Sequence, residues 1–251
     1  MIANLMMYAR PELETEHANF WTVIRMSLAQ RGIEAPAELA QNAGGFPVWE
    51  DLALVLSQTC GMPYRTRLHG RVQIFGTPDY GLEGCPAGYY RSAIVVRADD
   101  ARTSLSQFTG ARMAYNAPHS QSGFAALYNH LQPSGVWFDN RVESGGHLAS
   151  AIMVAQGQAD IASIDAQTWR LIQRYEPIAT QLRVLEFTVP TPGLPYITAL
   201  HLDPSTVFDA VSEAISNLLE ADAQALDLHG IVKIDTADYL AVPNPPASAL
   251  L

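Results

Sequence analysis

Three places in the middle of the chain carry side chains that can hold an anion, and each lies where a helix is expected to begin. The first is the segment SQSG, which comprises Ser120, Gln121, Ser122 and Gly123. Unpaired N–H groups of a first helical turn, the helix dipole and two hydroxyls favour a negative charge, and glycine lets a ligand approach the backbone. The same segment also suits an ordinary serine cap, which satisfies these N–H groups without a ligand.

The other two places supply a histidine and a carboxylate. His147 follows two glycines in SGGHLAS, and once protonated it could donate to an anionic oxygen from either ring nitrogen, or it could cap its own helix. Asp165 ends an apolar run and opens a helix, so it could accept from a ligand hydroxyl or serve as an N-cap. Ligands of open α/β sheets collect at the carboxyl ends of strands, and the joint occurrence of these junctions predicts a ligand site there.

The elements that position these residues follow from the hydrophobic pattern. Short apolar runs predict buried strands at 3–9, 52–57, 71–76, 90–97, 112–117 and 160–164. Between them, apolar residues recur at helical spacing, as at Trp21, Ile24 and Leu28, and Asp203 with Pro204 is typical of a helix start. Strands that alternate with helices indicate an α/β fold with mainly parallel sheets.

Composition limits the classes of function. The chain has 251 residues, 48% hydrophobic and 16% charged, which suits one large globular domain or two smaller α/β lobes. A formal charge of −10 argues against a nucleic-acid partner, which needs a basic face. No apolar run approaches the length of a membrane span. The first nine residues lack the pattern of a secretory signal, so the sequence is compatible with a cytoplasmic chain and with a mature or truncated form of an exported one.

The order of these features resembles the phosphate-, phosphite- and phosphonate-binding solute-binding proteins of ABC importers. In that family an S-T-S-G turn opens a helix and binds phosphonate oxygens, a G-H pair follows about two dozen residues later, and an A-x-G-x-x-D segment comes next. The corresponding segments here are SQSG at 120–123, GGH at 145–147 and AQGQAD at 155–160. Tyr90, just before the serine of the 90–97 strand in YYRS, also matches.

The resemblance implies a type II periplasmic-binding fold with two lobes, crossing strands between them and a ligand cleft between the lobes. Lobe I would comprise 1–93 plus 188–251, and lobe II would comprise 94–187. The implied function is a monomeric protein, without catalysis, cofactor or metal, that clamps a small anionic solute and delivers it to a membrane permease. The resemblance also implies a periplasmic location.

Ligand-binding residues carry over by position. From lobe II and the crossing strand, the resemblance implies Tyr90, Ser120, Gln121, Ser122, Gly123, His147 and Asp165. From lobe I, it implies Tyr8, Trp49, Gln58 and Thr59, although a core role for Trp49 is also open. Two departures affect the ligand. Gln121 replaces the threonine of the family turn, and uncharged Gln167 and Leu194 stand where aminophosphonate binders place carboxylates, so a simpler oxyanion is favoured.

The two cysteines suggest two further possible roles, a disulfide and a catalytic thiol. Cys60 and Cys85 both fall in lobe I, and in an oxidising compartment they could form a disulfide. Alternatively, Cys60 as nucleophile, His147 as base and Asp165 as orienting group would make a thiol hydrolase. A third alternative is a cytoplasmic ligand-sensing module of the same fold, although no helix-turn-helix segment is recognisable in the sequence.

Overall fold

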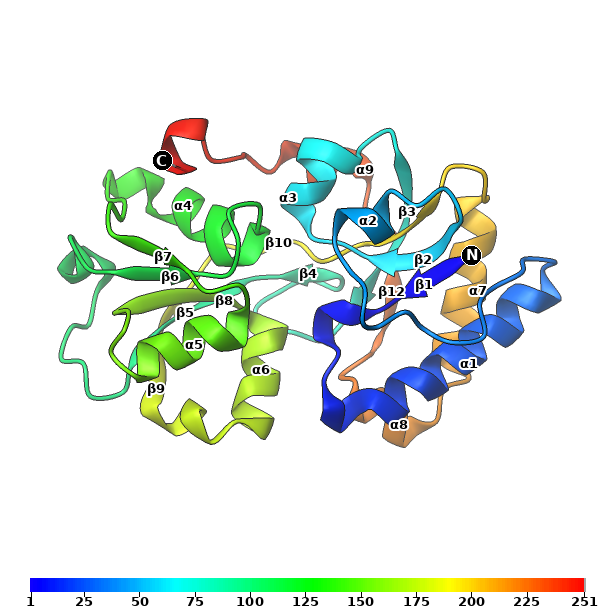
Figure 1. Ribbon diagram of the computed structural model, residues 1–251, viewed down its shortest axis with the longest axis horizontal. Helices are drawn as coiled ribbons and strands as arrows, with labels where there is room; N and C mark the ends of the chain where they lie inside the picture. The colour runs from blue at the N-terminus through cyan, green and yellow to red at the C-terminus, as the bar shows by residue number, and fades with distance from the viewer. Residues whose placement is uncertain (251) are drawn as a thin grey trace. The chain divides into compact units, whose positions relative to one another are not determined.

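The computed structural model describes residues 1–250, which form two compact units (Figure 1). Unit 1 comprises Met1–Tyr89 and Pro192–Ala241, and unit 2 comprises Tyr90–Thr191 together with the tail from Val242 onward. Each unit contains a five-stranded sheet and its own hydrophobic core. The predicted α/β fold with two lobes is therefore confirmed.

The sheet of unit 1 has the strand order β1-β2-β11-β3-β12. Its strands are β1 (Ile2–Asn4), β2 (Leu54–Gln58), β11 (Tyr196–Ala199), β3 (Val72–Asp79) and β12 (Gly230–Val232). β1 and β2 are parallel, whereas β11 runs antiparallel to both β2 and β3, and β12 runs antiparallel to β3. Every residue of β2 and β11 is buried, as expected for strands covered on both faces.

Helices pack around this sheet. They are α1 (Glu14–Gln30), α2 (Phe46–Trp49), α3 (Gly61–Pro63), α7 (Pro204–Ser216), α8 (Glu220–Ala225) and α9 (Thr236–Ala241). Shorter helical turns are η1 (Met6–Tyr8), η2 (Pro11–Leu13) and η3 (Tyr64–Leu68). α1 packs against α7, which also contacts β3. As predicted, Asp203 caps α7 by accepting from the Thr206 N–H, and Trp21, Ile24 and Leu28 form a buried stripe on α1.

The sheet of unit 2 has the order β7-β6-β8-β5-β9. Its strands are β7 (Arg141–Glu143), β6 (Met113–Tyr115), β8 (Ile161–Asp165), β5 (Ser92–Arg97) and β9 (Leu182–Phe187). The helical segments are η4 (Leu105–Phe108), η5 (Gln121–Ala125), α4 (Ala126–Leu131), η6 (Gln132–Ser134), α5 (His147–Ala155), α6 (Ala166–Tyr175), η7 (Pro177–Gln181) and η8 (Ala247–Leu250). Among residues 1–250, none of the helices combines the length and the apolar composition needed to cross a membrane.

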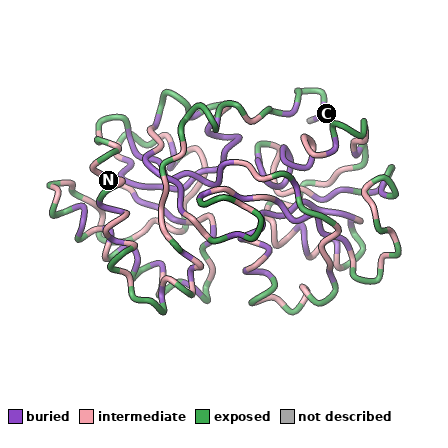
Figure 2. Tube along the Cα trace, turned by 180° about the vertical axis from the view of Figure 1, so that it is seen from behind, coloured by how far each residue is buried: buried purple, intermediate pink, exposed green. Residues whose placement is uncertain are grey.

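Both faces of this second sheet are covered. On one face, α5 and α6 pack Val154 and Trp169 against Val95 and Ile164. On the opposite face, Phe124 and other apolar residues of η5 and α4 pack against Ile94 and Ile161 of the strands. In Figure 2 the central strands of the sheets are accordingly traced mostly in the colour of buried residues.

The sheets are mixed rather than mainly parallel, which corrects the sequence-based expectation. β6 is parallel to β7 and β8, but β5 is antiparallel to β8 and β9. The reason is the route of the chain. The chain enters β5 and β11 from the other unit. β5 begins beside the end of β8, with Ser92 opposite Asp165, and β11 begins beside the end of β2, with Tyr196 opposite Gln58. A strand that begins at that edge must run antiparallel.

The boundaries between the units differ from the prediction mainly at the C-terminus. The chain passes between the units at β4 (Tyr89–Tyr90) and β10 (Thr191–Pro192), which pair with each other, within a few residues of the expected positions. The segment 188–251 was expected to remain in lobe I, but the tail from Val242 belongs to unit 2. There the Asn129 side chain donates to the Pro243 carbonyl at 2.8 Å, and Arg141 donates to the Ala249 carbonyl at 2.7 Å.

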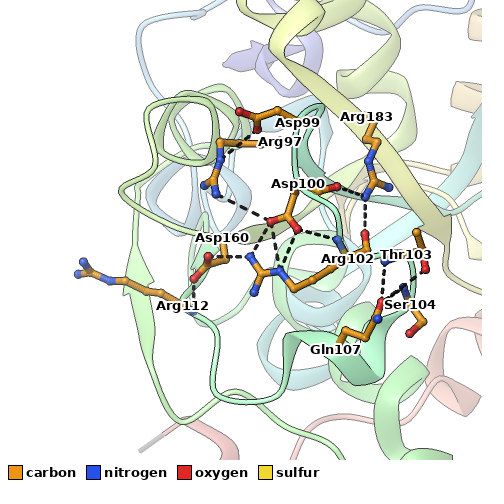
Figure 3. Close-up of polar contacts among 10 residues, drawn as sticks. All are labelled: Arg97, Asp99, Asp100, Arg102, Thr103, Ser104, Gln107, Arg112, Asp160 and Arg183. Carbon is orange, nitrogen blue, oxygen red and sulfur yellow. Dashed lines mark hydrogen bonds and ion pairs between the residues drawn. The ribbon is translucent and has the colours of Figure 1, made fainter.

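A network of ion pairs and hydrogen bonds stabilises the segment that follows β5 (Figure 3). The Asp100 carboxylate accepts from Arg102 Nη2 at 2.6 Å, and Arg102 also reaches Asp160 at 2.9 Å. Arg183, from β9, donates to the Asp100 carbonyl at 2.9 Å and to the Arg102 carbonyl. Since β5 begins at the edge where β8 ends, this network lies at the edge of the sheet opposite the polar junctions predicted from the sequence.

Candidate functional site

The predicted anion-binding residues of unit 2 gather at one edge of its sheet. β6, β7 and β8 are parallel, so the segments that follow them, which carry Ser120–Gly123, His147 and Asp165, emerge on the same side. β5 is antiparallel to β8 and begins there, which adds the preceding Tyr90 to this edge. The carboxyl edge of the sheet is where α/β folds usually bind ligands.

Ser120 is the N-cap of the helical segment formed by η5 and α4. Its Oγ accepts the N–H of Gly123 at 3.0 Å, so the capping role considered from the sequence is present. This bond uses an acceptor lone pair of Ser120 and leaves its own hydroxyl hydrogen to donate to another group. Ser120, Gln121 and Ser122 are at most 5% exposed, so each polar atom here is largely removed from water.

Ser122 is hydrogen-bonded to His147, with 2.9 Å between Oγ and Nε2. The histidine is half-buried overall, but its Nδ1 atom is shut off from water. This burial lowers the pKa of His147 to about 4, and the nearby Ser163 backbone offsets the effect only in part. His147 is therefore neutral near pH 7, and the cationic donor that the sequence suggested is not formed at that pH.

The tautomer of neutral His147 determines what the Ser122 hydroxyl can do. Although the Ser163 backbone lies close enough to affect the ring, no hydrogen bond of normal geometry reaches Nδ1 from the described residues. A backbone carbonyl raises the pKa of a histidine by accepting from a ring N–H, so the Ser163 backbone favours the tautomer with its proton on Nδ1. Nε2 then accepts from the Ser122 hydroxyl, whose oxygen lone pairs stay available, whereas the opposite tautomer would leave the Ser122 hydrogen for a further acceptor.

Gly123 is required by its neighbours in the fold. A Cβ at this position would lie 1.9 Å from Oδ1 of Asn116 and 3.2 Å from Cε1 of His147. A side chain at this position would therefore clash with the protein itself, and the contact of Gly123 with a ligand stays a prediction. Asn116, which the sequence analysis did not select, has a buried Oδ1 without a hydrogen-bond partner among the described residues.

Asp165 and Tyr90 are buried at the same edge. Asp165 is 1% exposed and accepts the Thr168 N–H at 2.9 Å, so it caps α6, the simpler of its two predicted roles. Tyr90 lies in β4 and is 4% exposed. Whether Asp165 also contacts a ligand stays a prediction.

Unit 1 has a separate polar cluster at the carboxyl edge of its own sheet. Tyr8 follows β1, Gln58 ends β2, Tyr80 follows β3 and Tyr196 begins β11. Gln58 Nε2 donates to the Leu194 carbonyl at 3.1 Å and to the Tyr80 hydroxyl at 3.3 Å. The rings of Tyr8 and Tyr80 meet edge to face at 5.0 Å, and burial, with the Tyr80 phenol beside it, raises the pKa of Tyr196.

Two other residues predicted in lobe I are buried. Trp49 is 4% exposed, packs with Leu54 and Tyr64, and donates its indole N–H to the Gln58 carbonyl at 3.1 Å. Its side chain therefore supports Gln58, in line with the core role considered from the sequence. Thr59 is wholly buried, and its hydroxyl has no hydrogen-bond partner among the described residues.

The thiol-hydrolase alternative finds no support in these contacts. Nε2 of His147 is hydrogen-bonded to Ser122 rather than to Cys60, and Asp165 caps α6. Cys60 and Cys85 are not joined by a disulfide in the structure, and Cys60 is buried whereas Cys85 is half-buried. A bridge between them under oxidising conditions stays a prediction.

The Ser122–His147 pair also has the residue types of a nucleophile and its base, but its chemistry does not suit that role. A histidine with a pKa of about 4 is a weak base near neutral pH, and general bases work best when their pKa is near the operating pH. The orienting acid of a serine hydrolase would accept from Nδ1, yet no hydrogen bond of normal geometry reaches this atom from residues 1–250.

The chain passes twice between two α/β units, at the paired strands β4 and β10, and each unit has polar residues at the carboxyl edge of a mixed sheet. This arrangement is the type II periplasmic-binding fold. A family model for periplasmic substrate-binding proteins of phosphonate ABC transporters matches residues 56–239. This match covers well over half of the chain, and the protein belongs to that family. The family supplies ligand to a membrane permease, and the sensing-module alternative is not favoured.

Solved structures of binding proteins share the fold of this chain. PhnD1 from Prochlorococcus marinus, in complex with methylphosphonate, has a TM-score of 0.69 and 15% identity over 95% of this chain and 94% of that one. PA3383 from Pseudomonas aeruginosa, a binding protein component of an ABC phosphonate transporter, has a TM-score of 0.68 and 16% identity over 95% and 83%. XAC2383 from Xanthomonas citri, bound to a chloride ion, has a TM-score of 0.69 and 15% identity over 95% and 92%. No curated protein matches in a sequence search.

Proposed function

We propose that this protein binds a small oxyanion-bearing solute, such as phosphate, phosphite or an alkylphosphonate, and presents it to the permease of an ABC importer. The observation that supports this most directly is the state of the Ser120 hydroxyl. Ser120 Oγ accepts from the Gly123 N–H, so this buried hydroxyl keeps its own hydrogen to donate, and Ser122, paired with His147, follows two residues later. Buried polar groups at a helix start suit anionic oxygens, which accept several hydrogen bonds at once.

The proposed site binds its anion with neutral donors. His147 is uncharged near pH 7, and Ser120, Gln121 and Ser122 carry no charge. Dipoles fixed in a buried environment can replace the hydration shell of an anion, because their interactions are stronger there than in water. The overall charge of −10 does not oppose this, since salt screens distant charges beyond about 10 Å.

We propose that the ligand lacks an amino group. The positions aligned with the carboxylates of aminophosphonate binders hold Gln167 and Leu194. Gln167 is 1% exposed and Leu194 is 6% exposed, and neither can provide a negative charge for an ammonium group. A buried ammonium group without an anionic partner is costly, which favours simple oxyanions and alkylphosphonates.

The remaining predicted residues are part of this proposal. Tyr90, Asp165 and the segment Ser120–Gly123, through its hydroxyls and backbone N–H groups, would bind the ligand from unit 2, and Tyr8, Gln58 and Thr59 would contribute from unit 1. Trp49 would act by supporting Gln58. We also propose that the protein works as a monomer in the periplasm, as members of its family do their work there, and that it catalyses no reaction.

The test is calorimetric titration of the wild type and of Ser122→Ala with methylphosphonate, phosphite, phosphate and sulfate. Ser122→Ala removes a hydrogen bond to a charged group and should weaken the best ligand by about 1.5–3 kcal/mol. Asp203→Ala is the matched control, because it removes the cap of α7 and should cost about 1 kcal/mol of stability without changing affinity. If no oxyanion binds the wild type, or if Ser122→Ala behaves like the control, the proposal is wrong.

A further inference from the structure

Two buried serines outside the predicted site converge on a single carbonyl oxygen of the helix start. Ser92, at the start of β5, and Ser163, in β8, donate to the Ser122 carbonyl at 3.0 Å and 2.6 Å. Ser92 is 1% exposed and Ser163 is completely buried. Their strand neighbours on the same face, Ile94 and Ile161, are core residues, so the hydroxyls stand out from an otherwise apolar surface.

These two bonds are the first links of a longer chain of hydrogen bonds. The Ser122 carbonyl belongs to the same peptide group as the Gly123 N–H, which donates to Ser120 Oγ at 3.0 Å. Donors on a carbonyl oxygen polarise the peptide group and strengthen donation by its N–H. In turn, a stronger bond into Ser120 Oγ makes the Ser120 hydroxyl a better donor to the next acceptor.

We propose that Ser92 and Ser163 are positioning residues of the anion site, which fix the Ser122–Gly123 peptide group and strengthen donation by Ser120. This inference rests on the proposed function, because it assigns a role in binding the same ligand. Neither serine contacts the ligand. Both act through one peptide group, and the sheet thereby determines the direction of the donors at the helix start.

Affinity for methylphosphonate provides the first test. Ser92→Ala and Ser163→Ala should each raise its Kd about 3- to 10-fold, the range that one intramolecular hydrogen bond represents. Thr198→Val is the matched control. Thr198 is also fully buried in a strand and donates its hydroxyl to a backbone carbonyl, that of Val55, at 2.8 Å, but it lies in the sheet of unit 1. The control should lower the melting temperature without changing the Kd.

A double-mutant cycle distinguishes positioning from a general loss of stability. If Ser163 acts through Ser120, Ser163→Ala should change the Kd less than about twofold in a Ser120→Ala background, because interacting sites are not additive. An independent structural effect would keep its full size in that background. NMR gives a readout that does not require ligand: the Gly123 amide proton should shift upfield in Ser163→Ala and in Ser92→Ala, but not in Thr198→Val.

The outcomes separate the two proposals. If Ser163→Ala does not fold, Ser92→Ala carries the same test through the second donor. If the wild type binds methylphosphonate and Ser122→Ala weakens it, while Ser92→Ala and Ser163→Ala leave both the Kd and the Gly123 shift unchanged, only the positioning role is overturned. If the wild type binds none of the oxyanions, the proposed function itself fails, and the Gly123 shift still reports whether the hydrogen-bond chain exists.

Discussion

At the scale of single residues, the burial of His147 should make the stability of the folded protein depend on pH. The pKa of His147 is lowered by burial to about 4, whereas the unfolded chain protonates this histidine near pH 6.5. Below pH 6.5 the unfolded state therefore binds a proton that the folded state does not bind. Stability should decrease as the pH falls from about 6.5 to about 4, and this single group should account for roughly 3 kcal/mol of the loss.

Replacing His147 isolates this contribution. His147→Asn cannot be protonated, so its free energy of unfolding should fall less than that of the wild type between pH 6.5 and pH 4, as measured by urea denaturation. His201→Asn, which changes an exposed histidine, is the control and should follow the wild-type curve. Parallel curves for the wild type and His147→Asn would show that His147 is not held neutral in the folded protein.

At the scale of elements, Asp100 joins the end of β5 to the strands beside it. Hydrogen bonds from Arg102 lower the pKa of Asp100 to about 2, despite burial of its side chain. A lowered pKa for a carboxyl group stabilises the fold at pH values above its unfolded value of about 3.8, and this stabilisation is lost as the pH falls through about 2.

The network therefore predicts a pH-dependent cost for Asp100→Asn. The variant should lose about 1–2 kcal/mol of stability at pH 7, a value reduced from the full pKa shift because Arg102 is 29% exposed. The difference from the wild type should shrink between pH 4 and pH 2 in denaturant titrations. Asp99→Asn, whose side chain is 86% exposed and 3.5 Å from Arg97, should change stability by less than about 0.5 kcal/mol. An equal loss in both variants would contradict the assignment.

Much of the element order could be predicted from the sequence, because it depends on local periodicity. The run RVQIFG became part of β3, the run at 160–164 became β8, and the pair Asp203–Pro204 opens α7. The strand directions could not be predicted in this way. Whether β5 and β11 run parallel or antiparallel depends on the edge at which the chain enters each unit, and residue patterns within a strand do not contain that information.

The site was predictable where its residues follow strands, and less so where its chemistry depends on packing. Ser120, His147 and Asp165 were found because each lies at a strand-to-helix junction. The neutral state of His147 results from burial that only the folded protein produces. Ser92 and Ser163 carried a usable signal, since each is a hydroxyl on the apolar face of a buried strand, but which carbonyl they reach depends on tertiary packing.

At the scale of the whole molecule, the proposal makes the two units act together. The two polar clusters belong to different units, at the carboxyl edges of two separate sheets. If one ligand takes contacts from Ser122 in unit 2 and from Tyr8 and Gln58 in unit 1, binding should favour a more closed arrangement of the units. The radius of gyration should therefore decrease when ligand is added.

Small-angle scattering with and without methylphosphonate, or another oxyanion that binds the wild type, tests this expectation. Ser122→Ala at the same ligand concentration is the control, because its weaker binding should leave its radius of gyration closer to the unliganded value. The same samples should show ligand stabilisation of about 2.7 kcal/mol in the wild type at a hundredfold excess over Kd. Stabilisation without compaction would mean that the ligand is held by unit 2 alone, and the contribution of Tyr8 and Gln58 would then be withdrawn.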